Sequence, residues 1–273
     1  MTNSETTTDP YTGIDDLALS LRDGVLSVTL NRPDSLNSLT APMLDTLSAA
    51  LEHAATDARV RVVRLGGAGR GFSSGAGISE SDQADRAASL GPDDVLAAAN
   101  RAVRSIVALP KPVVSVVQGP AAGVGVSLAI SADVILASER AYFLLAFTKI
   151  GLMPDGGASA LVAASIGRTR AMRMALLAER LTATDALDAG LVSAVYPADE
   201  LDAAVDGVLE TLKSGPAVAL RKTKQAINAA TLTELEPAFE RETDGQLKLL
   251  VSHDFREGTR AFQQRRAAVF TDD

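Results

Sequence analysis

The sequence predicts an α/β domain followed by a helical carboxyl-terminal region. Short apolar runs typical of strands alternate with glycine-rich turns and with segments of helical periodicity. Beyond Pro197 the strand pattern stops, and the expected helices are residues 200–212, 216–230, 234–251 and 255–268. We therefore expect a disordered polar tail at residues 1–12, a core domain at 13–197 and a helical region at 198–273.

The first elements form a β-β-α-β beginning. Asp23-Gly24 separates two apolar runs and is a typical hairpin turn. Thr40 precedes a stretch of helical spacing and is the expected N-cap. In chain order the expected elements are strands at 17–21 and 25–30, a helix from Pro42, and a strand at 60–65.

The middle of the chain repeats the order strand, glycine turn, helix. The expected elements are a loop at 66–77, a mobile polar segment at 79–94, a helix to about 109, strands at 113–117 and 134–137, a turn at 119–125, and a helix from about Val124. This alternation is typical of a sheet whose strands are covered by helices.

Composition excludes several classes of function. The 273 residues include no cysteine and two histidines, which argues against thiolate or histidine-rich metal sites. The net charge of −8 disfavours binding to nucleic acid. We find no apolar run long enough to span a bilayer and no export signal, so we expect a cytoplasmic protein without membrane contacts.

Two glycine-rich turns are candidates for binding a carbonyl oxygen. Residues 72–78 and 119–128 each follow a strand and leave backbone N–H groups directed outward. Two such donors make an oxyanion hole, which stabilises negative charge developing on a carbonyl oxygen. The alternative is that these glycines only permit tight turns.

One carboxylate stands out among apolar neighbours. Asp155 lies in the run Phe-Thr-Lys-Ile-Gly-Leu-Met-Pro-Asp-Gly-Gly at residues 147–157. A carboxylate there can act as a general base. The structural alternative is a turn or N-cap residue ahead of a helix at 158–166, a role that would lower its pKa.

Several runs, in order, resemble the enoyl-CoA hydratase/isomerase (crotonase) superfamily. They are residues 31–39, 72–80, 111–133, 151–154 and 181–192, and the ending 254–270 is similar to the family's last helix. The resemblance implies a ClpP/crotonase spiral of β-β-α units with a helical trimerisation region. It also implies trimers or hexamers, an acyl-CoA ligand and no cofactor. By motif position, the oxyanion-hole amides are those of Ala76 and Val124.

The departures from the family pattern point to one type of reaction. Hydratases of the family hold water between two glutamates, and here those positions carry Ser127 and Phe147. Neither side chain can replace a general base, so we expect hydration to be poor. Asp155 stands where several isomerases of the superfamily carry an acid. The resemblance therefore implies a Δ3 to Δ2 enoyl-CoA isomerase with Asp155 as proton shuttle.

The resemblance also suggests where the ligand lies. The expected substrate contacts are Leu36, Ser38, Gly77, Ile78 and Phe147. Arg265 or Arg266 would reach a phosphate of CoA in a neighbouring subunit, although an exposed arginine on a terminal helix is more often a solvated residue.

Three alternatives remain open. An acyl-CoA-binding protein could keep the pocket without the chemistry. Asp155 could instead attack carbon, as a similar acid does in aryl-CoA dehalogenases. Gly71-Phe-Ser-Ser-Gly75 also fits a nucleophile elbow, with Ser73 as nucleophile and His253 as its histidine, while His53 is expected to be structural.

Overall fold

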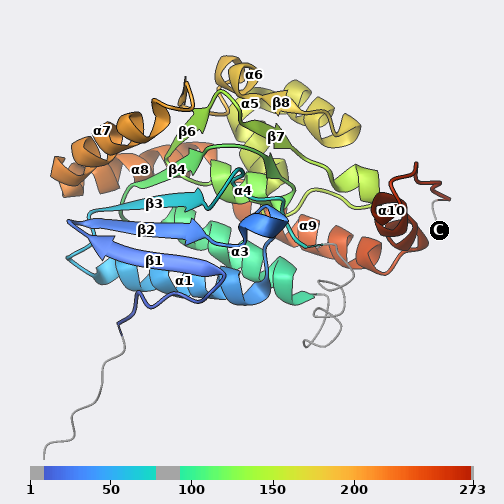
Figure 1. The fold of residues 1–273 in the computed structure, drawn as a ribbon, viewed down its shortest axis with the longest axis horizontal. Helices are drawn as coiled ribbons and strands as arrows, with labels where there is room; N and C mark the ends of the chain where they lie inside the picture. The colour runs from blue at the N-terminus through green and yellow to red at the C-terminus, as the bar shows by residue number, and fades with distance from the viewer. Residues whose placement is uncertain (1–8, 78–92, 272–273) are drawn as a thin grey trace, which may run out of the picture.

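A computed structural model describes residues 9–77 and 93–271 of the chain (Figure 1). Its centre is a six-stranded sheet in the order β1-β2-β3-β4-β6-β9. The first pair is antiparallel and every later pair is parallel. The strands are β1 (Leu17–Arg22), β2 (Val25–Leu30), β3 (Val62–Gly67), β4 (Val113–Val117), β6 (Val134–Ser138) and β9 (Ala194–Tyr196).

The predicted β-β-α-β beginning is confirmed. β1 and β2 form a hairpin across Asp23 and Gly24, whose φ angles are 48° and 81°. Helix α1 (Ala41–Thr56) starts where expected, and the hydroxyl of Thr40 accepts a hydrogen bond from the Met43 amide. This bond satisfies one of the amides that lack a partner in the first turn of a helix.

The central strand β4 is buried on both faces. In β4, Val114 and Val116 belong to a small core with helix α7 (Leu201–Ser214), while Val113 and Val117 belong to the large core. Helices α1 and α3 (Asp93–Ala108) pack on each other within that large core. Covering both faces explains why β4 consists of apolar residues and one serine instead of alternating with polar ones.

A second sheet lies beside the first. It has the order β5-β7-β8, with β5 and β7 parallel and β7 and β8 antiparallel. Its strands are β5 (Ala121–Ala122), β7 (Tyr142–Leu144) and β8 (Leu181–Thr182). The remaining elements of this part are η1 (Pro33–Ser35), α4 (Val124–Ile130), η2 (Phe147–Ile150), α5 (Ala158–Leu177) and α6 (Ala183–Ala189).

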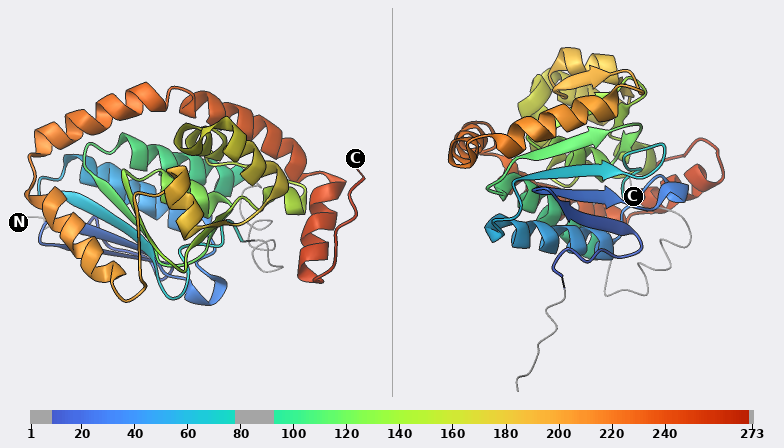
Figure 2. Two further views of the ribbon diagram at one scale, coloured as in Figure 1. Left: turned by 90° about the horizontal axis from the view of Figure 1, so that it is seen from above. Right: turned by 60° about the vertical axis from the view of Figure 1, so that its left-hand side comes forward.

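The chain after residue 197 is helical, as predicted. Helices α8 (Ala217–Thr231), α9 (Leu235–Leu250) and α10 (His253–Gln263) follow one another along one edge of the molecule (Figure 2). Lys224 anchors α8 because its ammonium donates to the Ile106 carbonyl at 3.0 Å and to Asp133 Oδ2 at 2.8 Å. Helix α7 is the first helix after residue 197. In contrast to α8, it packs its apolar side chains against the sheet and completes the core there.

Tyr11 ties the beginning of the described chain to the core. Residues 1–8 lie outside the described part, but residues 9–12 are fixed by Tyr11, which is buried. Its hydroxyl donates to Asp57 Oδ2 at 3.0 Å, and its ring contacts His53 edge to face. An aromatic side chain with a hydrogen-bonded hydroxyl thus fixes the chain just before the core domain.

The end of α10 differs from the prediction, whereas the first stretch of α5 agrees with it. Helix α10 ends at Gln263 instead of continuing to 268, and Arg265 has a left-handed φ of 53°. The helix predicted at 158–166 is present as the first part of α5, which is interrupted at Gly167 (φ 76°, ψ 158°), and a second helical stretch continues to Leu177. The expected mobile segment 79–94 falls almost entirely outside the described residues, and α3 begins at Asp93.

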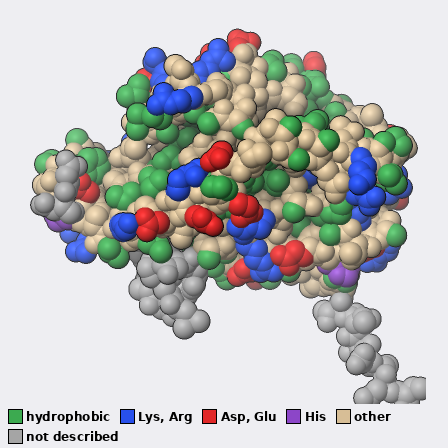
Figure 3. Space-filling view, turned by 180° about the vertical axis from the view of Figure 1, so that it is seen from behind, with side chains coloured by type: hydrophobic (Ala, Val, Ile, Leu, Met, Phe, Trp, Pro, Cys, Tyr) green, Lys and Arg blue, Asp and Glu red, His purple; other side chains and the backbone are tan. Residues whose placement is uncertain are grey.

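The surface carries charges of both signs. On the face shown in Figure 3, acidic and basic side chains are interspersed among apolar ones. Among residues 9–77 and 93–271, none of the helices combines the length and the apolar character needed to cross a bilayer.

Candidate active site

The two predicted glycine turns touch each other through their backbones. Gly75 has a φ of 86°, and a Cβ placed on it would lie 2.8 Å from the Ala122 carbonyl oxygen and 3.3 Å from Gly123 Cα. Gly123 has φ 54° and ψ −135°, a conformation that glycine alone adopts easily. Glycine is therefore needed at position 75 for the close approach and at position 123 for its backbone conformation. The contact between the two turns brings the residues that follow them, Ala76 and Val124, near each other.

The amides of these two residues are available as donors. The amide of Leu39 donates to the Gly75 carbonyl, and that of Val126 donates to the Gly123 carbonyl. Within the described part of the chain, the N–H groups of Ala76 and Val124 have no hydrogen-bond acceptor. Val124 is the first residue of α4, where an amide has no partner inside the helix.

Asp155 is held on a half-buried loop beside α4. Gln246 Nε2 donates to Asp155 Oδ2 at 2.7 Å, and Ser127 Oγ donates to the Asp155 carbonyl at 2.8 Å. A Cβ on the next residue, Gly156, would lie 2.8 Å from Val124 Cγ2. Helix α4 thus carries the Val124 amide at its first residue and fixes the Asp155 loop one turn later.

Asp155 does not cap helix α5. The N-cap residue is Gly157, without a side-chain capping bond, and the free amides of the first turn go to Glu242. Glu242 accepts from the Gly157 amide at 2.6 Å and from the Ser159 amide at 2.8 Å. The capping interpretation of Asp155 is therefore wrong, because a residue of α9 performs that role.

Glu242 is itself unusual. Its side chain is buried, and burial raises the pKa of its carboxyl above the ordinary range, although both amides act in the opposite direction. Sequence reasoning missed Glu242 and Gln246. They lie four residues apart on the buried face of α9, so polar residues on the inner face of an amphipathic helix were the available signal.

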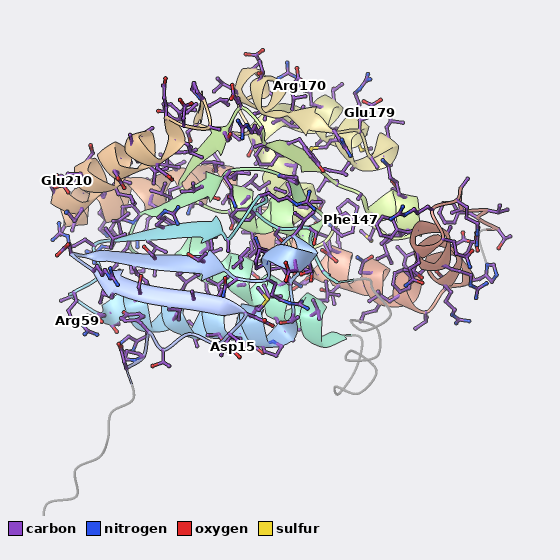
Figure 4. All side chains as sticks on the ribbon, viewed as in Figure 1. Asp15, Arg59, Phe147, Arg170, Glu179 and Glu210 are labelled. Carbon is purple, nitrogen blue, oxygen red and sulfur yellow. The ribbon has the colours of Figure 1, made fainter. Side chains whose placement is uncertain are left out.

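Ser127 and Phe147 are the residues that the resemblance aligns with the two glutamates of hydratases. Ser127 is fully buried and its hydroxyl is engaged with the Asp155 loop. Phe147, labelled in Figure 4, is also buried. Its Cζ atom lies 3.8 Å from the Cβ position of Gly123, so the ring is next to the second glycine turn.

The remaining expected substrate residues border the same loops. The Leu36 carbonyl accepts from the Ser74 amide, which ties its turn to the segment leading to Ala76. Ser38 is buried, and its hydroxyl accepts from Arg32 Nη1 at 2.9 Å, so its side chain stabilises the turn. Gly77 is buried, and Ile78 lies outside the described residues.

The predicted phosphate contacts lie on the terminal segment. Arg266 pairs with Glu257, Nη2 to Oε2, at 2.8 Å, and this guanidinium lowers the pKa of Glu257 to about 2. Arg265 follows the end of α10 and is exposed. A role of either arginine toward CoA stays a prediction.

Ser73 is not placed as a hydrolase nucleophile. Its side chain is fully buried, and Oγ donates to the Asn37 carbonyl at 2.8 Å and accepts from the Gly75 amide at 3.1 Å. His253 is exposed and contacts Asp254 and Thr271. Ser73 therefore shapes the first glycine turn.

Comparisons with known proteins identify the family of the chain. A profile described as Enoyl-CoA hydratase/isomerase matches residues 20–273. The chain is 38% identical to 1,2-epoxyphenylacetyl-CoA isomerase of Escherichia coli K12, covering 91% of this chain and 95% of that relative. It is 36% identical to a probable enoyl-CoA hydratase of Rhodobacter capsulatus, covering 92% and 96%.

A solved structure agrees as well. The crystal structure of an enoyl-CoA hydratase from Mycobacterium avium subsp. paratuberculosis K-10 is 65% identical, with a TM-score of 0.88, and covers 94% of this chain and 99% of that one. The chain therefore belongs to the enoyl-CoA hydratase/isomerase family, with its crotonase-like α/β fold, and is an acyl-CoA-processing enzyme. The relatives' names include isomerase and hydratase, so they define the class and not the reaction.

Proposed function

We propose that this enzyme shifts the double bond of a 3-enoyl-CoA to the 2-position by moving one proton through Asp155. One observation carries the proposal. Asp155, on a half-buried loop that packs against α4, is held by Gln246 and is not used as a helix cap, which Glu242 provides instead. A carboxylate held in this way near the amides of Ala76 and Val124 supports a role of Asp155 as a base.

The proposed chemistry needs only a base and the two donors. Removing a proton from carbon 2 of a 3-enoyl thioester, or from carbon 4 of a 2-enoyl thioester in the reverse direction, creates a dienolate. The negative charge of this dienolate collects on the thioester oxygen. The amides of Ala76 and Val124 would stabilise that oxygen, and the protonated carboxyl of Asp155 would return the proton to the other carbon. No external cofactor enters this balance.

Phe147 would assist by keeping water away from the proposed carbonyl site. A phenyl ring cannot orient or deprotonate water, and its position beside Gly123 places it next to the proposed carbonyl site. Excluding water protects the dienolate from side reactions and strengthens the electrostatic contacts around it. Leu36, Ser38 and Gly77 would border the rest of the acyl-CoA.

Support also comes from the relatives. The Escherichia coli protein at 38% identity is named an isomerase of a CoA thioester. Hydration is the second candidate, because the solved relative at 65% identity is described as an enoyl-CoA hydratase. Against it stand Ser127 and Phe147, neither of which is a base.

The test is the variant Asp155→Asn. Asparagine keeps the size of the side chain and still accepts a bond from Gln246, but it has no basicity. We expect double-bond migration in 3-enoyl-CoA thioesters to fall by about 10²–10⁴, with acyl-CoA affinity unchanged. The assays are absorbance of the conjugated product, solvent deuterium uptake and calorimetric binding.

A matched control is Asp206→Asn, which removes the same charge on the exposed face of α7 and should leave turnover intact. Full isomerisation by Asp155→Asn would sink the proposal. Tight binding without any turnover by the wild type would instead favour a binding protein. Hydration of 2-enoyl-CoA without migration would favour a hydratase, and halide release from an aryl-CoA would favour nucleophilic attack by Asp155.

We further propose that the protein assembles as a trimer or hexamer in the cytoplasm. The family resemblance implies this assembly, and the described surface includes apolar side chains that a partner could cover. Leu176 and Leu177, near the end of α5, are 62% and 57% exposed.

A further inference from the structure

We infer that Gln246 is the positioning residue of Asp155, which it holds ionised and in a single orientation for proton transfer. This inference rests on the proposed role of Asp155 as base. Its starting observation is the bond of 2.7 Å from Gln246 Nε2 to Asp155 Oδ2, which joins α9 to a loop 91 residues earlier in the chain.

The orientation of the Gln246 amide is fixed by its other end. Gln246 Oε1 accepts from the Met153 amide at 3.2 Å, and a backbone N–H can only donate. The oxygen must therefore face Met153, which leaves the Nε2 hydrogens to face Asp155. Because Gln246 is buried, the side chain has little freedom to turn over.

The packing of α9 maintains this contact. A Cβ on Gly245 would lie 2.3 Å from Met153 Sδ, so the helix approaches the loop more closely than a larger residue would allow. One turn earlier, Glu242 holds the amides of Gly157 and Ser159. The segment from Met153 to Ser159 is thus attached to one face of α9 at both of its ends.

A neutral donor suits a base better than a cation would. A hydrogen bond donated to a carboxylate favours its ionised form, which is the form that accepts a proton. A lysine or arginine in the same place would add a full positive charge and lower the basicity much further. Gln246 therefore orients the carboxylate without making it too weak a base.

The charged groups on the neighbouring elements have partners of their own or face solvent. On α9, Glu242 has both oxygens bonded to backbone amides. On α4, Ser127 does not titrate in the working range. On the neighbouring η2, Lys149 is exposed, and on α10, Asp254 Oδ1 accepts from the Thr271 amide at 2.8 Å.

The test is Gln246→Glu, which keeps the length of the side chain and an acceptor for Met153. The substitution replaces the Nε2 donor by a carboxylate oxygen that faces Asp155 Oδ2. The two carboxylates then repel each other, so that they share a proton and release it only at higher pH. We expect the acid limb of the kcat/KM profile for isomerisation to move to higher pH by about one unit or more. At pH 7 kcat should fall more than KM changes, and most of the loss should be recovered at higher pH.

Two further variants complete the design. Gln225→Glu adds the same charge on an exposed position of α8 and should leave the profile unchanged. Gln246→Met removes the donor without adding charge, and it should move the acid limb in the same direction by a smaller amount. It serves as the readout if the glutamate variant does not fold.

The inference is overturned if Gln246→Glu, or the methionine variant in its place, titrates like the wild type. A loss of turnover that is the same at every pH also overturns it, because it indicates a purely structural role. Failure of the proposed function looks different, since the wild type and Asp155→Asn would then isomerise equally or not at all.

Discussion

At the scale of single residues, the site depends on positions that tolerate one amino acid. Gly75 combines a positive φ angle with a backbone contact that leaves no space for a side chain, and Gly123 adopts φ 54° and ψ −135°, which glycine alone adopts easily. Asp155 is held by a side chain from another helix, and Ser127 serves only the backbone of its loop. Glycines set the geometry of the two amides, and Asp155 supplies the proposed chemistry.

The variant Gly75→Ala tests this geometry. Its Cβ would meet the Ala122 carbonyl at 2.8 Å, and the left-handed backbone adds about 1–3 kcal/mol of strain. We expect isomerase kcat/KM to fall by about 10²–10³, because the Ala76 donor moves away from the thioester oxygen. Gly207→Ala is the control, since a Cβ there meets nothing within 4 Å. Equal activity of the two variants would contradict the expectation.

At the scale of elements, α9 is the helix that organises the site. It carries Glu242 and Gln246 on its buried face, and both bind the loop that precedes α5. Two elements on opposite sides of this loop, α4 and α9, therefore fix Asp155 together. The site is positioned by helices, which hold a side chain more firmly than loops do.

The buried carboxyl of Glu242 predicts a pH dependence of stability. Burial raises its pKa in the folded protein above the unfolded value of about 4.3. The contribution of the protonated Glu242 carboxyl to the free energy of unfolding is therefore complete below a pH of about 4.3. This contribution is lost as the pH rises through the folded-state pKa. We expect the wild type to gain unfolding free energy relative to Glu242→Gln as the pH falls from about 7 to about 5. Urea unfolding at several pH values measures the difference in unfolding free energy between the two proteins. A difference that is constant with pH would contradict the prediction.

At the scale of the whole molecule, one sheet supports the site and one edge of helices completes it. Helix α7 closes the core of the sheet, whereas α8 is attached through polar contacts such as those of Lys224. Burial lowers the pKa of Lys224 and raises that of Asp133, and the direct contact of the two charges opposes both changes. The described surface also leaves apolar side chains exposed on α5.

The proposed assembly gives a prediction at this scale. We expect the protein to sediment at three or six times its chain mass of 28.3 kDa. The double variant Leu176→Glu, Leu177→Glu should lower that mass, because charges would oppose burial of this end of α5. A wild type that sediments as a single chain at micromolar concentration would contradict the proposed assembly.

The sequence by itself determined the local features and the identity of the unusual acid. The hairpin at Asp23-Gly24, the cap at Thr40 and the glycine turns before Ala76 and Val124 follow from rules that act over a few residues. Asp155 could be singled out because its neighbours are apolar. The resemblance added a family that the comparisons then showed.

Only the tertiary structure decided what surrounds that acid. Gln246 and Glu242 lie 91 and 85 residues from their partners, and no local pattern connects such distant segments. The same reason explains the anchoring of Tyr11 by Asp57, 46 residues away. Short-range propensities fix turns and caps. The partner of a buried polar group is decided only when the helices pack, because each such group must find a hydrogen bond inside the fold.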